Sequence, residues 1–209
     1  MATFSFRLQK RANRESVAVE ITDQFNHGDE EHINTYSHRW KGWNLLPTGF
    51  QPTDLERRWD WTLVVAQRAS GPNKVSIWVL RPTDAMRTIL PTLGVIILQE
   101  SVSPADGTPI TLVTLIGVHP KCRSMGYGFL RRSGVVKGVV LALLKFASKR
   151  AMTIRGSGLI GLDAVGRSKS LYERIGLMRT PKGDKRDGTR LPRCCQMTFL
   201  SRSCMNALR

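Results

Sequence analysis

The sequence predicts an α+β fold, in which a single mixed, mostly antiparallel, twisted β-sheet is flanked by helices. Short runs of β-branched and other apolar residues follow one another between turn residues, whereas helical periodicity dominates only after residue 126. The 209 residues are 41% hydrophobic and 23% charged, which is a globular composition. We therefore expect one domain over 1–209, with a variable N-terminal part at 1–60 and a core at 61–209.

The predicted strands lie between turns that contain Gly and Pro. Ser16 to Ile21 alternates apolar and polar residues like a strand, and the acidic stretch from Asp23 to His32 favours a short helix. Residues 71–73 and 104–107 predict turns. Further strands are expected at 61–68, 74–80, 93–99 and 110–118. Four strands in succession favour an antiparallel meander.

Helices and strands alternate in the second half. Apolar residues at helical spacing, with Lys and Arg between them, predict a helix from Gly126 through Arg150. A short apolar strand at 158–163 and a helix at 168–175, closed by Gly176, are expected next. The remaining predicted elements are a loop at 182–188 and a last strand at 193–200.

The positive charge is concentrated in the second half of the chain. Lys and Arg number 32 and Asp and Glu 16, a net charge of +16. Residues 1–104 hold 12 basic and 11 acidic side chains, net +1, whereas residues 105–209 hold 20 and 5, net +15. A field of that size attracts polyanions and repels cationic substrates. It favours a nucleic acid, an acidic macromolecule or a phosphate-rich cofactor as partner.

Several other classes are disfavoured. The 4 Cys and 4 His lack metal-ligand spacing, so no metal site is expected. The apolar runs are far shorter than the ~20 residues that span a bilayer, and the N-terminus lacks the apolar centre of a signal peptide. We expect a cytoplasmic protein with reduced thiols and no membrane span. The oligomeric state is not fixed by the sequence, which is compatible with a homodimer.

Tryptophans interleaved with basic residues mark the first 61 positions. Packing in the core is the favoured interpretation, and a platform that stacks bases is the alternative. The residues concerned are Trp40, Trp43, Trp59, Trp61, Arg39, Lys41, Arg57 and Arg58.

The most informative segment is the turn that follows the strand at 110–118. Arg123-x-x-Gly126-x-Gly128 leads directly into the predicted basic helix. Glycines let the backbone approach a ligand closely, and the first N–H groups of a helix attract anions. Neither a G-x-G-x-x-G dinucleotide fingerprint nor a G-K-[ST] P-loop is present in this turn. The turn therefore favours phosphate binding.

Two sequence patterns stand out in the second half of the chain. The pattern V-x-P-x-x-R-x-x-G-x-G is matched at every fixed position by Val118, Pro120, Arg123, Gly126 and Gly128. The pattern L-Y-E-x-x-G-[FL] is matched by Leu171, Tyr172, Glu173, Gly176 and Leu177. Together they resemble the motifs of the GNAT superfamily of acyl-CoA-dependent N-acetyltransferases. The expected order of elements agrees with that family over roughly residues 61–200.

The resemblance implies a GNAT-like fold, with acetyl-CoA or another acyl-CoA as co-substrate and an amine as acceptor. Val118 would pair its backbone with the pantetheine arm. Tyr172 would be the general acid for the leaving thiolate, and packing on the sheet is the alternative for its ring. The residues implied for the pyrophosphate, at the cofactor turn within 118–128, are Arg123, Ser124, Met125, Gly126, Tyr127 and Gly128.

No motif assigns the general base. Glu100 and Asp163, each at the end of a predicted strand, and His119 beside the turn are the candidates. A solvated surface role is the alternative for each of them.

The sequence also departs from the family pattern. Val165 stands seven residues before Tyr172, where many members have Asn, so one cofactor contact is in doubt. The stretch after Gly128 is longer than usual and favours an insertion or a broken helix. It contains Arg131, Arg132, Gly134 and Gly138.

Two classes of function are therefore open. The first is an acyl-CoA-dependent N-acyltransferase with an anionic or nucleic-acid-borne acceptor, one version of which modifies a base or tRNA. The second is a catalytically silent, GNAT-like module that binds nucleic acid, with steep salt dependence and no acyl-CoA binding. Its phosphate contacts would be Lys121, Arg123, Arg131, Arg132, Lys145, Lys149 and Arg150.

Overall fold

The structure is a computed structural model. It describes residues 3–10, 12–24, 75–102, 109–119, 122, 136–156, 158–164, 169–175, 177–184 and 195–198. The chain divides into two compact units by its internal contacts. The first comprises Met1–Pro72, Ser76–Val95 and Gly117–Val140, and the second comprises Asn73–Val75, Ile96–Ile116 and Leu141–Arg209.

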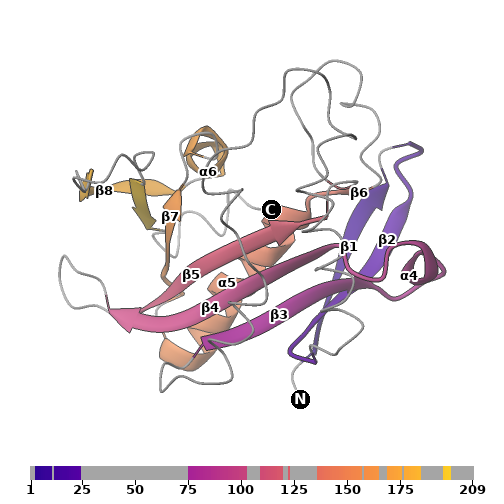
Figure 1. Ribbon diagram of the computed structural model, residues 1–209, viewed down its shortest axis with the longest axis horizontal. Helices are drawn as coiled ribbons and strands as arrows, with labels where there is room; N and C mark the ends of the chain where they lie inside the picture. The colour runs from indigo at the N-terminus through magenta and orange to yellow at the C-terminus, as the bar shows by residue number, and fades with distance from the viewer. Residues whose placement is uncertain are drawn as a thin grey trace, which may run out of the picture. The chain divides into compact units, whose positions relative to one another are not determined.

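Nine described strands hydrogen-bond in the order β6-β1-β2-β3-β4-β5-β7-β9-β8 (Figure 1). The strands are β1 Thr3–Lys10, β2 Ser16–Thr22, β3 Val75–Pro82, β4 Gly94–Val102, β5 Pro109–Val118, β6 Val136–Lys137, β7 Ile160–Ala164, β8 Met178–Asp184 and β9 Cys195–Thr198. The helices are α4 Met86–Ile89, α5 Val139–Arg155 and α6 Lys169–Arg174. Among the pairs with a described register, β5–β7 is parallel and the others are antiparallel. The α+β fold with a mixed, mostly antiparallel sheet is confirmed.

One face of β1, β2 and β3 forms the core of the first unit. Strand alternation places Val17, Val19 and Ile21 on one face of β2, where each is at most 1% exposed. Phe4 of β1 lies opposite Ile21 and contacts the ring of Trp78 edge-on, with the centroids 6.3 Å apart. Burial of these side chains explains why SVAVEIT pairs with its neighbours in this register.

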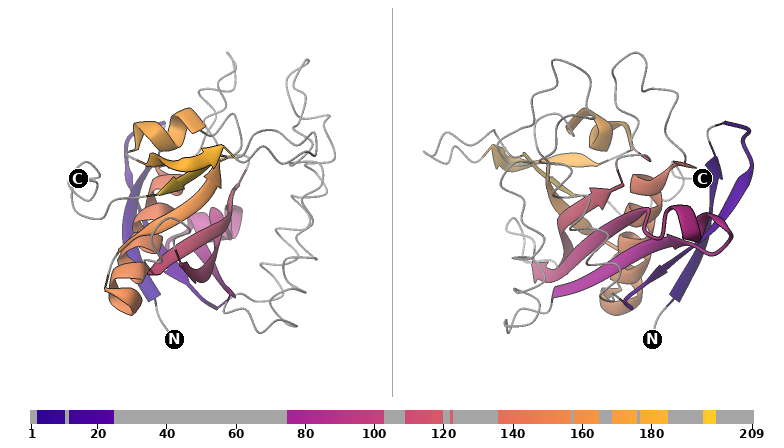
Figure 2. Two further views of the ribbon diagram at one scale, coloured as in Figure 1. Left: turned by 90° about the vertical axis from the view of Figure 1, so that its left-hand side faces the viewer. Right: turned by 45° about the vertical axis from the view of Figure 1, so that its right-hand side comes forward.

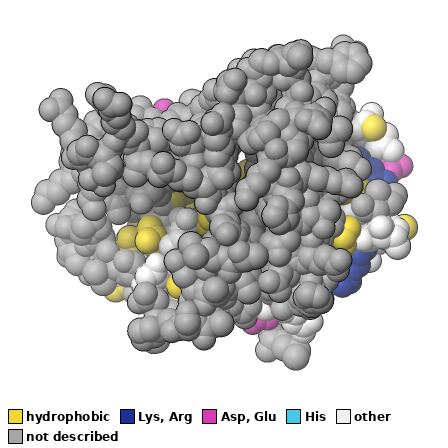
Figure 3. Space-filling view, viewed as in Figure 1, with side chains coloured by type: hydrophobic (Ala, Val, Ile, Leu, Met, Phe, Trp, Pro, Cys, Tyr) yellow, Lys and Arg dark blue, Asp and Glu magenta, His cyan; other side chains and the backbone are white. Residues whose placement is uncertain are grey.

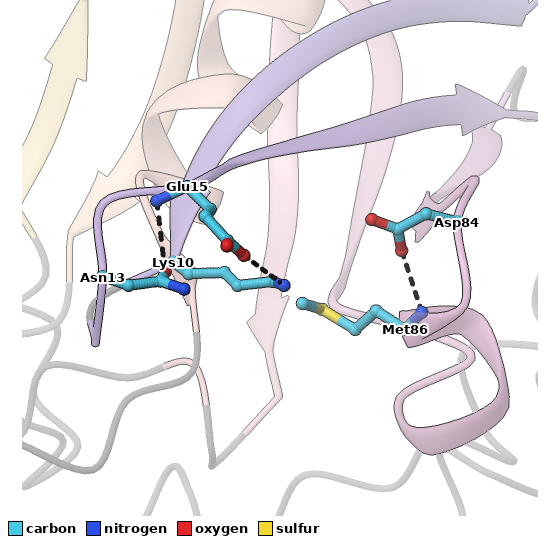
Figure 4. A network of polar contacts seen from close by, with 5 residues as sticks. All are labelled: Lys10, Asn13, Glu15, Asp84 and Met86. Atoms are coloured by element: carbon cyan, nitrogen blue, oxygen red, sulfur yellow. Dashed lines mark hydrogen bonds and ion pairs between the residues drawn. The ribbon is translucent and has the colours of Figure 1, made fainter.

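Polar contacts fix the turn between β1 and β2 (Figure 4). Lys10 Nζ lies 2.9 Å from Glu15 Oε2, and the backbone N–H of Glu15 donates to Asn13 Oδ1 at 3.2 Å. The hydrogen bond between the Lys10 and Glu15 side chains, together with the attraction between their opposite charges, raises the pKa of Lys10 and lowers the pKa of Glu15. Because both side chains are exposed, the pair orients the turn and adds little stability.

A similar mixture of charges surrounds α4. The N–H of Met86 donates to Asp84 Oδ1 at 2.9 Å just where the helix begins (Figure 4). Arg87 Nη1 lies 3.7 Å from Glu20 Oε1 of β2. Figure 3 shows basic and acidic side chains next to each other on the side where β2 and α4 lie in Figure 1. The described surface of the first unit is therefore mixed in charge rather than uniformly basic.

Helix α5 packs against the strands of the second unit (Figures 1 and 2). Its inner residues have essentially no exposed surface. They are Leu143, Leu144, Phe146, Ala147 and Ala151. Their helical spacing is the pattern that predicts a helix in this region.

A buried hydroxyl anchors the connection from α5 to β7. Ser148 Oγ donates to the carbonyl oxygen of Gly158 at 2.9 Å, inside the second unit. We expect Ser148→Ala to lower the free energy of unfolding by about 1–2 kcal/mol, because the buried carbonyl loses its donor. Urea denaturation measures this loss. Thr153→Ala is the matched control, since that hydroxyl donates to the Lys149 carbonyl on the exposed side of the same helix. Equal losses in the two variants would contradict the assignment.

The expected helix from Gly126 through Arg150 is wrong at both ends. Residues 136–137 form β6, which pairs with β1 at Gln9↔Lys137 and Lys10↔Val136, and α5 then runs over Val139–Arg155. Gly138, between them, has φ +85, which an α-helix does not allow. The valines of this stretch fit a strand as well as a helix, so periodicity alone does not separate the two. Residues 126–135 lie outside the described residues.

Other differences concern short or polar elements. β1, α4 and β8 were not expected, and β8 overlaps the predicted loop at 182–188. β2, β3, β4, β5, β7, α6 and β9 each fall within a few residues of a predicted element. Several expected features lie outside the described residues. They are the strand at 61–68, most of the helix within 23–32, the turns at 71–73 and 104–107, and the four tryptophans Trp40, Trp43, Trp59 and Trp61.

Candidate active site

β5 and β7 pair over a short stretch and then separate. In the described strands their pairing stops at Val113 and Leu162, although β5 continues to Val118 and β7 to Ala164. Figure 1 shows the two strands running apart beyond this point. The pairs are Thr111↔Ile160, Leu112↔Gly161 and Val113↔Leu162. We call residues 114–116 of β5 and 163–164 of β7 the β5–β7 split.

Beyond the last pair with β5, β7 stays paired with β9 on its other side. From Gly161 to Ala164, β7 pairs with β9, starting at Gly161↔Thr198 and ending at Ala164↔Cys195. β7 therefore follows β9 rather than β5 over its last residues. Beyond Val113 and Leu162, the facing edges of β5 and β7 are therefore not bonded to each other. Backbone groups at such a strand edge can pair with an extended ligand.

The sequence motif begins on a buried stem at the end of β5. Val118 ends the strand, and the next N–H, of His119, donates to the carbonyl oxygen of Leu93 at 2.9 Å. The N–H of Cys122 then donates to the carbonyl oxygen of His119 at 2.8 Å. Because His119 and Cys122 are only 6% and 5% exposed, the start of the cofactor turn is fixed by packing as well as by hydrogen bonds. Burial also makes His119 less accessible than the half-buried Glu100.

Tyr172 lies near the end of α6. Its carbonyl oxygen accepts hydrogen bonds from the N–H groups of Ile175, at 3.2 Å, and Leu177, at 3.0 Å. The second bond runs from an N–H to the carbonyl oxygen five residues earlier, a pattern that closes many helix C-termini. The side chain of Leu177, which makes this bond, is buried. The side chain of Tyr172 is half-buried, and this burial raises the pKa of its phenol. The phenol is therefore neutral at physiological pH and able to donate a proton.

The two carboxylate candidates lie on strands of the second unit. Glu100 is half-buried near the end of β4. Asp163 is in β7, beyond the last pair with β5, and lies opposite Gln196 of β9. β4 and β7 flank β5 in the strand order, so both carboxylates are on strands adjacent to the one that carries the cofactor motif.

The start of α5 differs from the expected arrangement. Phosphate binding was expected where Gly128 leads directly into a helix, but the first residue of α5 is Val139. The N–H groups at the start of α5 therefore do not directly follow the motif. The glycine at position 138 is the signal in the sequence that could have located the helix start. Its φ is +85, and it stands directly before Val139. The six residues implied for the pyrophosphate, 123–128, lie outside the described residues, and their role stays a prediction.

Within the part of the chain that the structure describes, no three His, Cys, Asp or Glu residues gather closely enough to hold a metal ion. No helix among those residues combines the length and apolar character needed to cross a membrane.

Comparison of the sequence with family models and with curated proteins gives no match. Solved structures do match. A chimera of spermidine N-acetyltransferase SpeG from Vibrio cholerae and hSSAT gives a TM-score of 0.52 at 14% identity, over 90% of this chain and 98% of that one. FeeM, an N-acyl amino acid synthase from uncultured soil microbes, gives 0.52 at 7% identity over 90% and 93%. A bacterial toxin gives 0.51 at 12% identity over 99% and 95%.

Identities this low show the fold and not the activity. The chain has the fold of the GNAT acetyltransferases, a mixed and mostly antiparallel sheet with helices. The fold implied by the two motifs is thereby confirmed.

Proposed function

We propose that the chain is an acyl-CoA-dependent N-acyltransferase that uses acetyl-CoA as donor. The observation that carries this proposal is the β5–β7 split, which lies on the strand that runs into the turn at 118–128. The pantetheine arm of CoA contains two amides, and these can pair with a strand edge as an added strand does. The pyrophosphate then reaches the glycine-rich turn, where backbone N–H groups and Arg123 supply donors.

Acyl transfer needs an amine held against the thioester and a proton for the leaving sulfur. The amine nitrogen attacks the carbonyl carbon, the C–N bond forms, and the C–S bond breaks with its electron pair leaving on sulfur. Tyr172 donates its phenolic proton to that thiolate. A base takes the proton that the amine loses, and transfer of this proton back to Tyr172 restores the starting state. Burial raises the pKa of Tyr172, so its phenol carries the proton at neutral pH before the C–S bond breaks.

The acceptor that we propose is an amine carried by an anionic molecule, such as a nucleic acid or an acidic protein. Residues 105–209 carry a net charge of +15, and CoA brings only a few negative charges. Helix α5 contributes to this excess with basic residues and no acidic one, namely Lys145, Lys149, Arg150 and Arg155. Spermidine, the substrate named for one structural neighbour, is a polycation and would be repelled by such a field.

Glu100 is the carboxylate that we propose as general base, because its half-buried side chain lies on a strand next to β5. We expect Glu100→Gln to lower kcat about 100-fold. The rise in melting temperature caused by acetyl-CoA should stay unchanged.

Thiol release from acetyl-CoA, measured with a panel of amines on nucleotides, tRNA and acidic peptides, reports kcat. Glu20→Gln, on β2, is the control. An unaffected Glu100→Gln together with an inactive Asp163→Asn would assign the base to Asp163.

Donor binding is the most accessible test of the proposed class. Acetyl-CoA at 100 times its Kd should stabilise the folded chain by about 2.7 kcal/mol. Tight RNA binding with a steep salt slope, without any stabilisation by acetyl-CoA, would favour the silent nucleic-acid-binding module instead.

A further inference from the structure

Strand β1 is an edge strand over most of its length. On one side it pairs with β2 from Thr3 to Gln9. On its other side it pairs with β6, which covers only Gln9 and Lys10 (Figure 1). Among the residues that the structure describes, no strand pairs with residues 3–8 on that side. We call residues 3–8, on the side away from β2, the β1 edge.

A hydrogen bond at the end of β1 shows which backbone groups this edge presents. The N–H of Lys10 donates to the carbonyl oxygen of Glu15, which lies across the hairpin, at 2.8 Å. The register between β1 and β2 continues from there, and successive residues of an antiparallel ladder direct their backbone groups to alternate sides. The even-numbered residues of β1 therefore bond to β2. Thr3, Ser5 and Arg7 direct their N–H and C=O groups outward.

The β1 edge lacks features that keep edge strands from pairing. Proline, a β-bulge and clustered charge are such features. The edge contains no proline and one charged residue, Arg7, and its register with β2 has no shift. The side chains of Thr3, Ser5 and Arg7 are exposed, and those of Phe4 and Phe6, on the other face, are half-buried. An added strand would bond the outward backbone groups and bury more of the two rings.

The sequence of the β1 edge fits a second copy of itself. Two antiparallel copies keep their core faces on one side, with outward backbone groups opposite each other, only where odd-numbered residues meet odd-numbered residues. Placing Ser5 opposite Ser5 of the second copy meets this condition and brings Thr3 opposite Arg7. Every outward-directed residue of the edge is then paired. Phe4 of each copy lies across from Phe6 of the other, an aromatic cross-strand pair that stabilises sheets.

β6 and the charges favour this register over its neighbours. Shifting one copy by two residues toward β6 would put Thr3 opposite Gln9, which already pairs with Lys137. With Ser5 at the centre, Arg7 faces an uncharged threonine, so no like charges meet across the strands. The edge also belongs to residues 1–104, whose net charge is +1, and not to the half with +15, which would repel a second copy.

We propose that two copies of this chain associate through their β1 edges, as antiparallel strands that pair symmetrically about Ser5. The surface and the register of this homodimer go beyond the function proposed above and do not depend on it. Because the paired segment is short, the interface belongs to the weak class, and we expect a Kd on the order of 10 µM.

Sedimentation equilibrium of the wild-type chain, from about 1 µM to about 1 mM, measures this association. We expect the average mass to rise to twice that of the monomer. Ser5→Lys should weaken the association at least tenfold, because it sets two like charges directly opposite each other. Ser16→Lys, which adds the same charge at an exposed serine of β2, should leave the association unchanged.

Cysteine crosslinking tests the register. In the proposed pairing the two Ser5 Cα atoms lie about 5.5 Å apart, inside the range of roughly 4.4–6.8 Å that a disulfide spans. Ser5→Cys should therefore form a covalent dimer under mild oxidation, beyond what the native cysteines of the wild type give. Thr3→Cys is the matched control, because the two Thr3 residues are at least about 13 Å apart. Mixing Thr3→Cys with Arg7→Cys should restore the crosslink.

Three results would overturn the inference. The first is a wild type that stays monomeric at about 1 mM, even if the β1 edge captures a strand of another protein. The second is a dimer that Ser5→Lys and Ser16→Lys affect equally. The third is a Thr3→Cys chain that crosslinks as readily as Ser5→Cys. Absence of acetyl-CoA binding would refute the proposed function and leave this inference standing, so the two can fail separately.

Discussion

Gly126→Glu is expected to abolish the rise in melting temperature that acetyl-CoA produces in the wild type. Gly126 is the first of the two glycines in the R-x-x-G-x-G turn. A glutamate there adds a side chain where the backbone must approach the pyrophosphate, and it places a negative charge beside negative phosphates. Both effects oppose binding, so the stabilisation should fall from about 2.7 kcal/mol at 100 times the wild-type Kd to nearly zero.

The matched control for this variant is Thr153→Glu, which adds the same charge on the exposed side of α5. Its response to acetyl-CoA should resemble that of the wild type. A full thermal shift in Gly126→Glu would show that the phosphates bind elsewhere. The segment around Gly138, directly before the first residue of α5, would then be the next candidate.

Tyr172→Phe is expected to lower kcat by about 10²–10⁴-fold while leaving the affinity for acetyl-CoA nearly unchanged. The variant keeps the ring, so packing in α6 is preserved and the melting temperature should not change. What is lost is the proton donor for the thiolate. If the ring of Tyr172 only packs on the sheet, kcat will be unaffected. Tyr36→Phe, outside both motifs, is the control.

The pH dependence follows from the same group. Because burial raises the pKa of Tyr172, its phenol stays protonated at pH values where an ordinary phenol has begun to ionise. The donor is therefore available at every pH below its raised pKa and is lost only as the pH rises through it. We expect the alkaline limb of the kcat profile to lie above pH ~10, the ordinary phenol value. A limb at neutral pH that disappears in Tyr172→Phe would contradict the assignment.

The elements with strong local patterns could be predicted from the sequence. β2 alternates apolar and polar residues, β3, β4 and β5 are apolar runs between turn residues, and α6 ends at Arg174, shortly before the glycine at position 176 of the sequence. Their side-chain pattern alone specifies which face is buried, so no distant partner is needed to identify them.

The elements that were missed depend on partners far away in the sequence. β8, MRTPKGD, is polar and contains Pro and Gly, and it is a strand because it pairs with β9. β6 has only two residues and exists through its pairing with β1. The start of α5 was misplaced for the same reason, since valines suit a strand or a helix until the partner is known.

The candidate site shows the same division. The L-Y-E-x-x-G-L motif correctly indicated the helix end that holds Tyr172, because the N–H of its last leucine, Leu177, donates to the Tyr172 carbonyl oxygen in a local capping pattern. The end of the β5–β7 ladder could not be read from the sequence, since it depends on the pairing of strands that lie far apart along the chain. The sequence thus indicates the chemistry of the site, and the strand registers show where β5 and β7 separate.

Native mass spectrometry of the wild-type chain mixed with acetyl-CoA, and separately with RNA, tests the central claim most directly. The account predicts one acetyl-CoA bound to each chain, and loss of that complex in Gly126→Glu but not in Thr153→Glu. A chain that binds RNA and remains free of acetyl-CoA at millimolar concentrations would contradict it.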